Sequence, residues 1–151
     1  MAERADSTVI LALDAIVKAL ETLKGQSGSS YLTDVRTVKA FDGPDDLRLP
    51  RPSVLVKVAG WGPDLPLNAP HHNTPVTFQV ACLLNEAQAW RKAWNLAADV
   101  MRVLQTDVTI DETIKGGLFA EAKEVEAEGD VGEAMVVVTL KGIVFWTTTA
   151  P

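Results

Sequence analysis

Apolar residues near the N-terminus recur at spacings of three and four, as they do along one side of an α-helix. Within residues 7–24 the positions on this spacing are Val9, Ile10, Leu13, Ile16, Val17, Leu20 and Leu23. Asp6 or Ser7 is suited to cap the start of the segment, and Gly25 is placed to end it. The pattern predicts an amphipathic helix with one face to bury.

Two segments in the middle of the chain alternate apolar residues with others, as half-buried strands do. One spans residues 53–59, and its shared face carries Val54, Val56 and Val58. The other spans residues 76–84, and its shared face carries Val76, Phe78, Val80 and Cys82. A further strand is predicted over Tyr31–Phe41, where the apolar residues follow no clean period.

A second helix is predicted over Glu86–Gln105. Asn85, with Gln88 three residues later, can satisfy two backbone amides at the helix start. The expected apolar stripe of this helix consists of Trp90, Trp94, Ala97, Met101 and Leu104. A stripe of this width, beside the aliphatic first helix, is suited to cover one face of a sheet.

The last third of the chain predicts a long C-terminal β-hairpin. Its strands are expected over Phe119–Glu128 and Ala134–Thr147, joined by the turn residues 129–132. Helix propensity over residues 120–128 offers an alternative, but the terminal strand needs a pairing partner, which favours the hairpin. The predicted fold class is α+β, with a mostly antiparallel sheet, two helices packed on one face and this hairpin.

The terminal strand is also a candidate interface. It is long and apolar, and at a sheet edge it would offer unpaired backbone groups to a neighbouring chain. The candidate interface residues on this strand are Val136, Val138 and Leu140.

Prolines concentrate in one part of the chain, with seven of the eight lying between Gly43 and Pro75. The stretch from Gly60 to Pro75 is predicted to be a long proline-rich loop. Its candidate contact residues are Trp61, Leu65, His71 and His72. Trp61, between two glycines, is either a binding hot spot or a local anchor of the loop. The adjacent histidines lack metal-ligand spacing and companion ligands, so solvated loop residues are favoured over a metal site.

Composition limits the possible classes of protein. The chain has 151 residues, of which 47% are hydrophobic, and this length predicts one folded domain over residues 1–151. Its net charge of −6 argues against binding duplex DNA by phosphate neutralisation. The single cysteine, Cys82, has no partner for an internal disulfide and is expected to be buried. Neither a membrane span nor a secretory leader is expected, so the interpretation is a protein of a reducing cytoplasm.

The acidic residues are concentrated in one segment. Between Asp107 and Glu133 lie nine acidic residues and two lysines, so this segment accounts for the whole net negative charge. On a strand, Glu124, Glu126 and Glu128 share one face and repel each other unless they are solvated. A wet hairpin face is favoured over a cation site or a catalytic carboxylate pair. A third hypothesis makes these residues an acidic channel wall that DNA passes without sticking.

No motif for catalysis or nucleotide binding is present. Gly25–Gly28 departs from the spacing of a serine nucleophile motif, and Gly60–Gly62 is not followed by the third glycine of a dinucleotide-binding turn. The sequence therefore predicts no catalytic residues, no bound metal and no cofactor.

The order of elements resembles the tail terminator proteins of long-tailed bacteriophages. The resemblance rests on four features: the N-terminal helix, the strand Pro52–Val58 before a long loop, the strand Thr77–Leu84 running into a helix that contains tryptophan, and the closing hairpin with Val136–Leu140. It spans most of the chain and is one of architecture and pattern. The loop over residues 60–75 has no counterpart assigned in the family.

The resemblance implies a non-enzymatic subunit of a ring, with a hexamer as the expected stoichiometry. Such a ring caps the head-proximal end of the tail tube, ends tube polymerisation and presents a surface for head joining. The implied partners are further copies of the chain, the tail tube protein and the head-tail connector, with DNA passing through the lumen without specific binding. The implied location is the virion, and the host cytoplasm during assembly.

Within this resemblance, Glu124, Glu126 and Glu128 become the candidate lumen residues. Two rival functions remain. One is a head-tail connector or neck protein, which would also form a ring. The other is a small cytosolic enzyme or ligand-binding domain, which would need a pocket with convergent polar groups.

Overall fold

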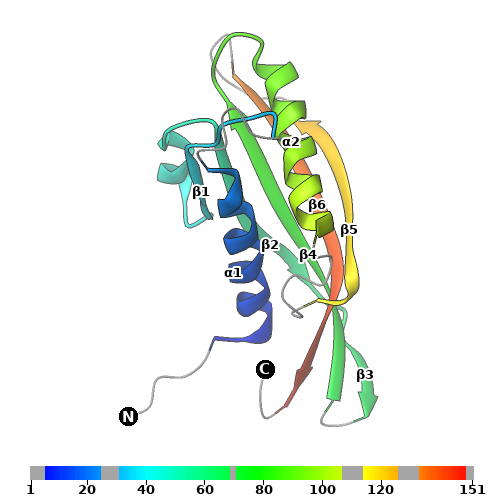
Figure 1. Cartoon of the computed structure of the whole chain (residues 1–151). Coiled ribbons are helices and arrows are strands. Elements are labelled where there is room, and N and C mark those ends of the chain that lie inside the picture. The colour runs from blue at the N-terminus through cyan, green and yellow to red at the C-terminus, as the bar shows by residue number, and fades with distance from the viewer. Residues whose placement is uncertain (1–5, 25–30, 69–70, 107–113, 126–132, 149–151) are drawn as a thin grey trace.

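The computed structural model describes residues 6–24, 31–68, 71–106, 114–125 and 133–148 (Figure 1). The helices are α1 (Thr8–Leu20), which continues into the short 3-10 helix η1 (Glu21–Leu23), the 3-10 helix η2 (Pro44–Arg48) and α2 (Ala89–Thr106). The strands are β1 (Thr37–Ala40), β2 (Ser53–Trp61), β3 (Leu65–Asn68), β4 (His71–Leu84), β5 (Lys115–Val125) and β6 (Ala134–Thr147).

The strands form one mixed sheet in the order β1-β2-β4-β6-β5, with β3 also paired to β4. Only β1 and β2 are parallel, and every other pairing is antiparallel. The predicted hairpin is confirmed, because β5 pairs along β6 from Lys115 to Val125. The α+β class and the mostly antiparallel sheet are confirmed as well.

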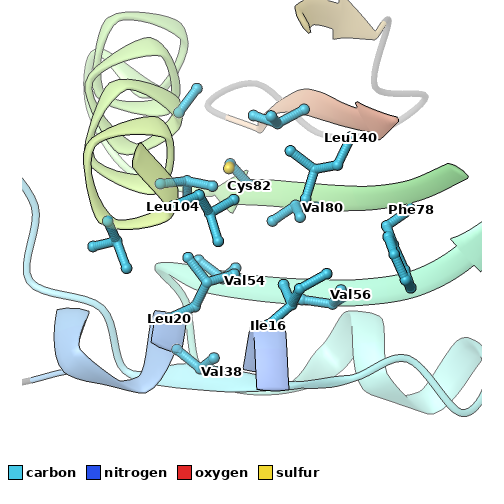
Figure 2. Packing of buried hydrophobic residues seen from close by; sticks show 14 of the residues in the cluster. Ile16, Leu20, Val38, Val54, Val56, Phe78, Val80, Cys82, Leu104 and Leu140 are labelled. Atoms are coloured by element: carbon cyan, nitrogen blue, oxygen red, sulfur yellow. The ribbon is translucent and has the colours of Figure 1, made fainter. Parts of the chain in front are cut away.

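Both long helices lie against the same face of the sheet (Figure 1). The alternation of β2, β4 and β6 turns their even-numbered apolar residues toward the helices, as predicted. Figure 2 shows Ile16 and Leu20 of α1 and Leu104 of α2 in the same cluster as the strand residues Val54, Val56, Phe78, Val80, Cys82 and Leu140. This single layer of side chains between helices and sheet is the hydrophobic core.

The first helix matches its prediction closely. Ser7 is its N-cap, and its side chain accepts a hydrogen bond from the backbone N–H of Ile10 at 3.4 Å. Val9, Leu13, Ile16 and Leu20 are buried. The last turn tightens into η1, with Lys24 as its C-cap.

The second helix corrects the sequence prediction at its start and in its buried face. Gln88 has a positive φ of 59°, so the regular helix begins at Ala89 instead of Glu86. The face on the sheet is built from Ala89, Ala93, Leu96, Ala97, Val100, Val103 and Leu104. Trp90 and Trp94 were expected on this face and are instead 58% and 38% exposed. Small alanines let the helix backbone approach the sheet, and the neighbouring tryptophans are turned outward.

The predicted loop over residues 60–75 is wrong, because most of this segment is strand. β2 continues to Trp61, and β3 then follows along the same side of β4. Pro66 lies in the outer strand β3, the kind of strand to which prolines of a sheet are mostly confined. Pro75 of β4 lies between the residues that pair with β2 and those that pair with β3, and its carbonyl accepts the N–H of Gly62 at 2.8 Å. The prolines thus occupy the positions of a sheet that tolerate them.

The terminal strand is not at the sheet edge, which was the condition for its role as an interface. β6 lies between β4 and β5. It pairs with β4 from Ala134 to Thr147 and with β5 between Met135 and Ile143. Val136, Val138 and Leu140 are buried beneath the helices, with exposed fractions of at most 1%. These three residues belong to the core and are not available as interface residues.

Candidate functional site

The sheet has an open face, on the side opposite the two helices. Its residues are Leu55 and Lys57 of β2 and the odd-numbered residues of β4 and β6. In register across the three strands, Leu55 lies beside Ala81 and Ala81 beside Val137, and the next row holds Lys57, Gln79 and Thr139. In the chain as described, neither long helix packs on this face.

A groove of about 390 Å³ runs over this open face. It is lined by Phe41, Leu47, Leu55, Lys57, Gln79, Ala81, Lys123, Met135, Val137 and Thr139. Its floor is mainly apolar, and among the described residues the charged side chains that line it are Lys57 and Lys123. A partner that carries apolar groups and a negative charge matches this lining.

One wall of the groove is positioned by Asp46. Its carboxylate accepts a hydrogen bond from Lys39 Nζ at 2.8 Å and another from the backbone N–H of Asp42 at 2.7 Å. The hydrogen bond from Lys39 holds the pKa of Asp46 below its usual value, and the same contact raises the pKa of Lys39. This pairing fastens η2 to β1, and Leu47 of η2 then forms the rim of the groove.

At the other end of the sheet an arm extends beyond both helices (Figure 1). We define the arm as β3, residues 71–75 of β4 and residues 143–147 of β6, together with Trp61 and Asp64 at the end of β2 and before β3. Gly62, between these two side chains, has a φ of 130°, a conformation that favours glycine. The chain can therefore change direction here and continue as β3.

A polar network ties the arm together. Trp146 Nε1 donates a hydrogen bond to Thr74 Oγ1 at 2.7 Å, and Thr74 Oγ1 donates to Asp64 Oδ1 at 2.7 Å. The other oxygen of Asp64 lies 2.7 Å from His72 Nδ1. This series of charge-assisted and neutral hydrogen bonds thus links β4, β6 and the segment before β3.

Aromatic contacts cover both faces of the arm. On the helix side His72 stacks on Trp146, with ring centroids 4.2 Å apart and planes at 11°, and Trp61 meets Trp146 at 5.7 Å. On the opposite side His71 stacks on Phe145 at 5.8 Å. Trp61 and Phe145 remain 41% and 46% exposed. Trp61 therefore anchors the arm locally, one of the two alternatives left open by the sequence, and it keeps an exposed aromatic surface.

The histidines lie in a strand and not in the predicted loop, although His71 is exposed as the sequence predicted. Both lie in β4 and stack on aromatic rings, and His72 is partly buried against Trp146 and Asp64. Within the described ranges no three histidine, cysteine, aspartate or glutamate side chains gather as a metal site would require.

The other candidate residues do not join these surfaces. Leu65 pairs with Asn73 through its backbone at the start of β3, and its side chain lies outside the described part of the structure. Glu124 of β5 pairs with Val136 of β6, and only the backbone of Glu124 is described. Glu126 and Glu128 lie outside the described residues. The hypothesis of an acidic lumen wall therefore stays a prediction.

A third surface, missed at the sequence level, lies on α2. Trp90 and Trp94 are one turn apart on its outer side, with Arg91 lying over the Trp90 ring at 5.5 Å. Beside Trp90 is a hollow of about 600 Å³ lined by residues 85–90 and Glu133. The i, i+4 spacing of the two tryptophans is the signal that marks them as one stripe, but it does not say which way the stripe faces.

Cys82 is buried in the core, as predicted. Burial raises the pKa of its thiol to about 12, and the negative charge of Asp99 adds to the shift. The thiol is thereby kept protonated and chemically inert in the folded protein.

A comparison with protein-family models and a search of curated proteins both find no match for this chain. Among the described helices, none has the length and apolar character that crossing a membrane requires.

Proposed function

We propose that this chain is a structural subunit of a bacteriophage tail, of the tail terminator type. In this role it forms a ring on the head-proximal end of the tail tube, ends tube polymerisation and presents a surface for head joining. The observation that carries the proposal is the distribution of uncovered apolar surface over three separate places: the open sheet face, the arm and the outer side of α2. A ring subunit that binds two neighbours and a tube needs several such surfaces.

The arrangement of elements supports the proposal. The helix, strand, helix and hairpin order on which the resemblance rests is the order in the structure, and both helices pack on one face of the sheet. The long loop expected after Val58 is the one feature of the resemblance that the structure replaces, since residues 60–75 instead build the arm. An ordered arm with exposed Trp61 and Phe145 is a rigid contact surface, and rigid surfaces lose less entropy on binding.

The test is co-assembly with the purified tail tube protein of the same phage. We expect the chain to co-sediment with preformed tubes and to appear at one end of each tube by electron microscopy. A double variant, Trp61→Ala with Phe145→Ala, should lose tube binding, whereas Leu11→Ala on the outer side of α1 should bind normally. Absence of wild-type binding to tubes would refute the terminator assignment.

A head-tail connector or neck protein is the first alternative, and it is distinguished by binding to the portal side instead of the tube. A small ligand-binding domain is the second, and the groove on the open face is the observation that favours it. Its volume of about 390 Å³ falls within the range of small-molecule pockets, and Lys57, Gln79 and Thr139 supply polar groups. The groove is open on one side, however, and an apolar groove on an open sheet face also suits a protein partner.

A further inference from the structure

Residues 42–49 form a strap that leaves the sheet after β1, returns to it before β2 and carries η2 in its middle. Hydrogen bonds fix the chain at both ends of the strap. Before it, the N–H of Phe41 donates to the carbonyl of Val56 at 2.8 Å. After it, Thr37 Oγ1 donates to the carbonyl of Pro50 at 2.8 Å. The strap is therefore a short segment between two anchored ends.

Between these ends, apolar packing does little to hold the strap. Of the residues of η2, all of which the structure describes, only Asp46 is buried. Leu47 lines the groove, yet it keeps 41% of its surface exposed. Arg51 Nη2 donates to the carbonyl of Leu47 at 2.9 Å, but this bond joins two residues of the same connection between β1 and β2. A segment that buries so few apolar groups is the kind that opens locally while the rest of a protein stays folded.

The contact that joins the middle of the strap to the sheet is ionic. Asp46 Oδ1 accepts a hydrogen bond from Lys39 Nζ at 2.8 Å, and Asp46 Oδ2 accepts one from the N–H of Asp42 at 2.7 Å. Lys39 lies in β1 in register with Leu55, so it stands on the open face beside the floor of the groove. Only 10% of the Asp46 side chain is exposed, so water competes weakly for these bonds.

We propose that residues 42–49 are a strap, hinged at its two anchored ends, which closes over one end of the groove, and that the bond between Asp46 and Lys39 is its latch. While the latch is made, Leu47 forms the rim of the groove. Release of the latch lets the rim move away from the floor, while the sheet and the core stay folded. The strap thus sets how wide a group the groove admits.

Hydrogen exchange followed by mass spectrometry tests the latch. Asp46→Ala should speed exchange at the amides of residues 42–49 by about tenfold, because hydrogen bonds to a charged group are lost there. The amides of β2, β4 and β6 should exchange as in the wild type. Asp45→Ala is the matched control, because it removes the same charge from the exposed neighbouring position and should leave the strap unchanged.

A second variant removes the other half of the latch. Lys39→Met keeps the aliphatic stem and removes the ammonium group, so it should also speed exchange in the strap. Its effect should be smaller than that of Asp46→Ala, because the N–H of Asp42 keeps its acceptor. Since both residues act through one contact, the double variant should exchange no faster than Asp46→Ala alone. Circular dichroism and thermal unfolding verify that each variant is folded, and Lys39→Met carries the test should Asp46→Ala unfold.

Access to the groove is measured with a thiol placed on its floor. Ala81→Cys supplies this thiol, and the native Cys82 is buried, so it does not compete for the reagent in the folded protein. The rate of reaction with N-ethylmaleimide should rise severalfold when Asp46→Ala is added to Ala81→Cys. The rate should stay unchanged when Asp45→Ala is added instead.

Four results would overturn the inference. They are exchange in the strap that latch variants leave unchanged, an Asp45→Ala control that speeds it as much, acceleration spread over the whole sheet, and a floor thiol whose reactivity does not change. The inference does not depend on the tail role. Tail tubes are absent from these experiments, so failure of the strap leaves the proposed function standing, and absence of tube binding leaves the strap standing.

Discussion

Asp99 is a buried carboxylate whose partners are backbone amides from a distant segment. Its side chain is fully buried on α2, and it accepts hydrogen bonds from the N–H of Leu32 at 3.1 and 2.9 Å and from the N–H of Thr33 at 2.9 Å. Arg102 Nη1 lies 3.8 Å from the same carboxylate and its guanidinium lies over the Tyr31 ring. Asp99 thus fastens the segment before β1 to the second helix.

We expect Asp99→Ala to lower the free energy of unfolding by about 3 kcal/mol, because the N–H groups of Leu32 and Thr33 lose a charged acceptor. Asp99→Asn keeps one acceptor oxygen and should show a smaller loss. The exposed residue Asp14 on α1 gives the matched control, since Asp14→Ala should change stability by less than about 0.5 kcal/mol. Urea denaturation followed by fluorescence measures all three. Equal effects of Asp99→Ala and Asp14→Ala would contradict the role of Asp99.

Cys82 makes stability depend on alkaline pH. The pKa of this thiol rises from 9.0 to about 12 on folding because of its burial. Its contribution to stability is therefore fully present below pH 9 and is lost as the pH rises from 9 toward 12, at about 1.4 kcal/mol per pH unit. The difference in unfolding free energy between the wild type and Cys82→Ala should shrink at this rate. A difference that stays constant over this range would disprove the assignment.

At the level of single residues, the sequence predicted burial better than orientation. The alternating valines of β2 and β4 and the position of Cys82 in the core followed from periodicity alone. In α2 the alanines and the tryptophans both recur at i, i+4, so periodicity did not decide between them. The outcome depended on how closely the helix approaches the sheet, which is a tertiary property. The role of Asp99 could not be predicted either, because its hydrogen-bond partners lie 66 and 67 residues away along the chain.

Among the elements, the arm is held together by side chains more than by its short outer strand. β3 has only four residues and pairs with β4 alone. Asp64, just before β3, joins it to Thr74 and His72 of β4. The order of β3 should therefore depend on this one carboxylate.

We expect Asp64→Ala to speed hydrogen exchange at the amides of β3, while the amides of β2 and β6 in the core exchange as in the wild type. Asp34→Ala, at an exposed position before β1, is the control and should leave β3 unchanged. Hydrogen exchange measured by mass spectrometry separates these regions. Uniform acceleration across the sheet would mean that Asp64 stabilises the whole fold and not the arm.

The strands of the proline-rich segment could not be predicted from the sequence. Clustered prolines predict a loop because each proline lacks the backbone N–H that strand pairing uses and restricts the backbone conformation of the residue before it. Here Pro66 lies in an outer strand and Pro75 lies opposite the interruption at Gly62, positions that cannot be recognised before the strand pairing is known. The hairpin of β5 and β6, by contrast, follows from two alternating segments joined by a glycine-containing turn. The place of β6 between β4 and β5 was not predictable, because the pairing of β6 with β4 is a long-range contact.

For the whole molecule, the main feature is a sheet with helices on one face only. The covered face holds the core, and the open face, the arm and the outer side of α2 carry the apolar surface that remains exposed. Soluble monomers seldom leave several such surfaces free. Our account is that other subunits of an assembly cover them, with the tail tube on the arm.

The most direct test of this account is the length of tail tubes polymerised from purified tube protein with and without this protein, measured by electron microscopy. We expect shorter tubes as the protein is added, each with a ring at one end, and no shortening by the Trp61→Ala, Phe145→Ala double variant. Tubes of unchanged length and without end rings, at any ratio of the two proteins, would contradict the account.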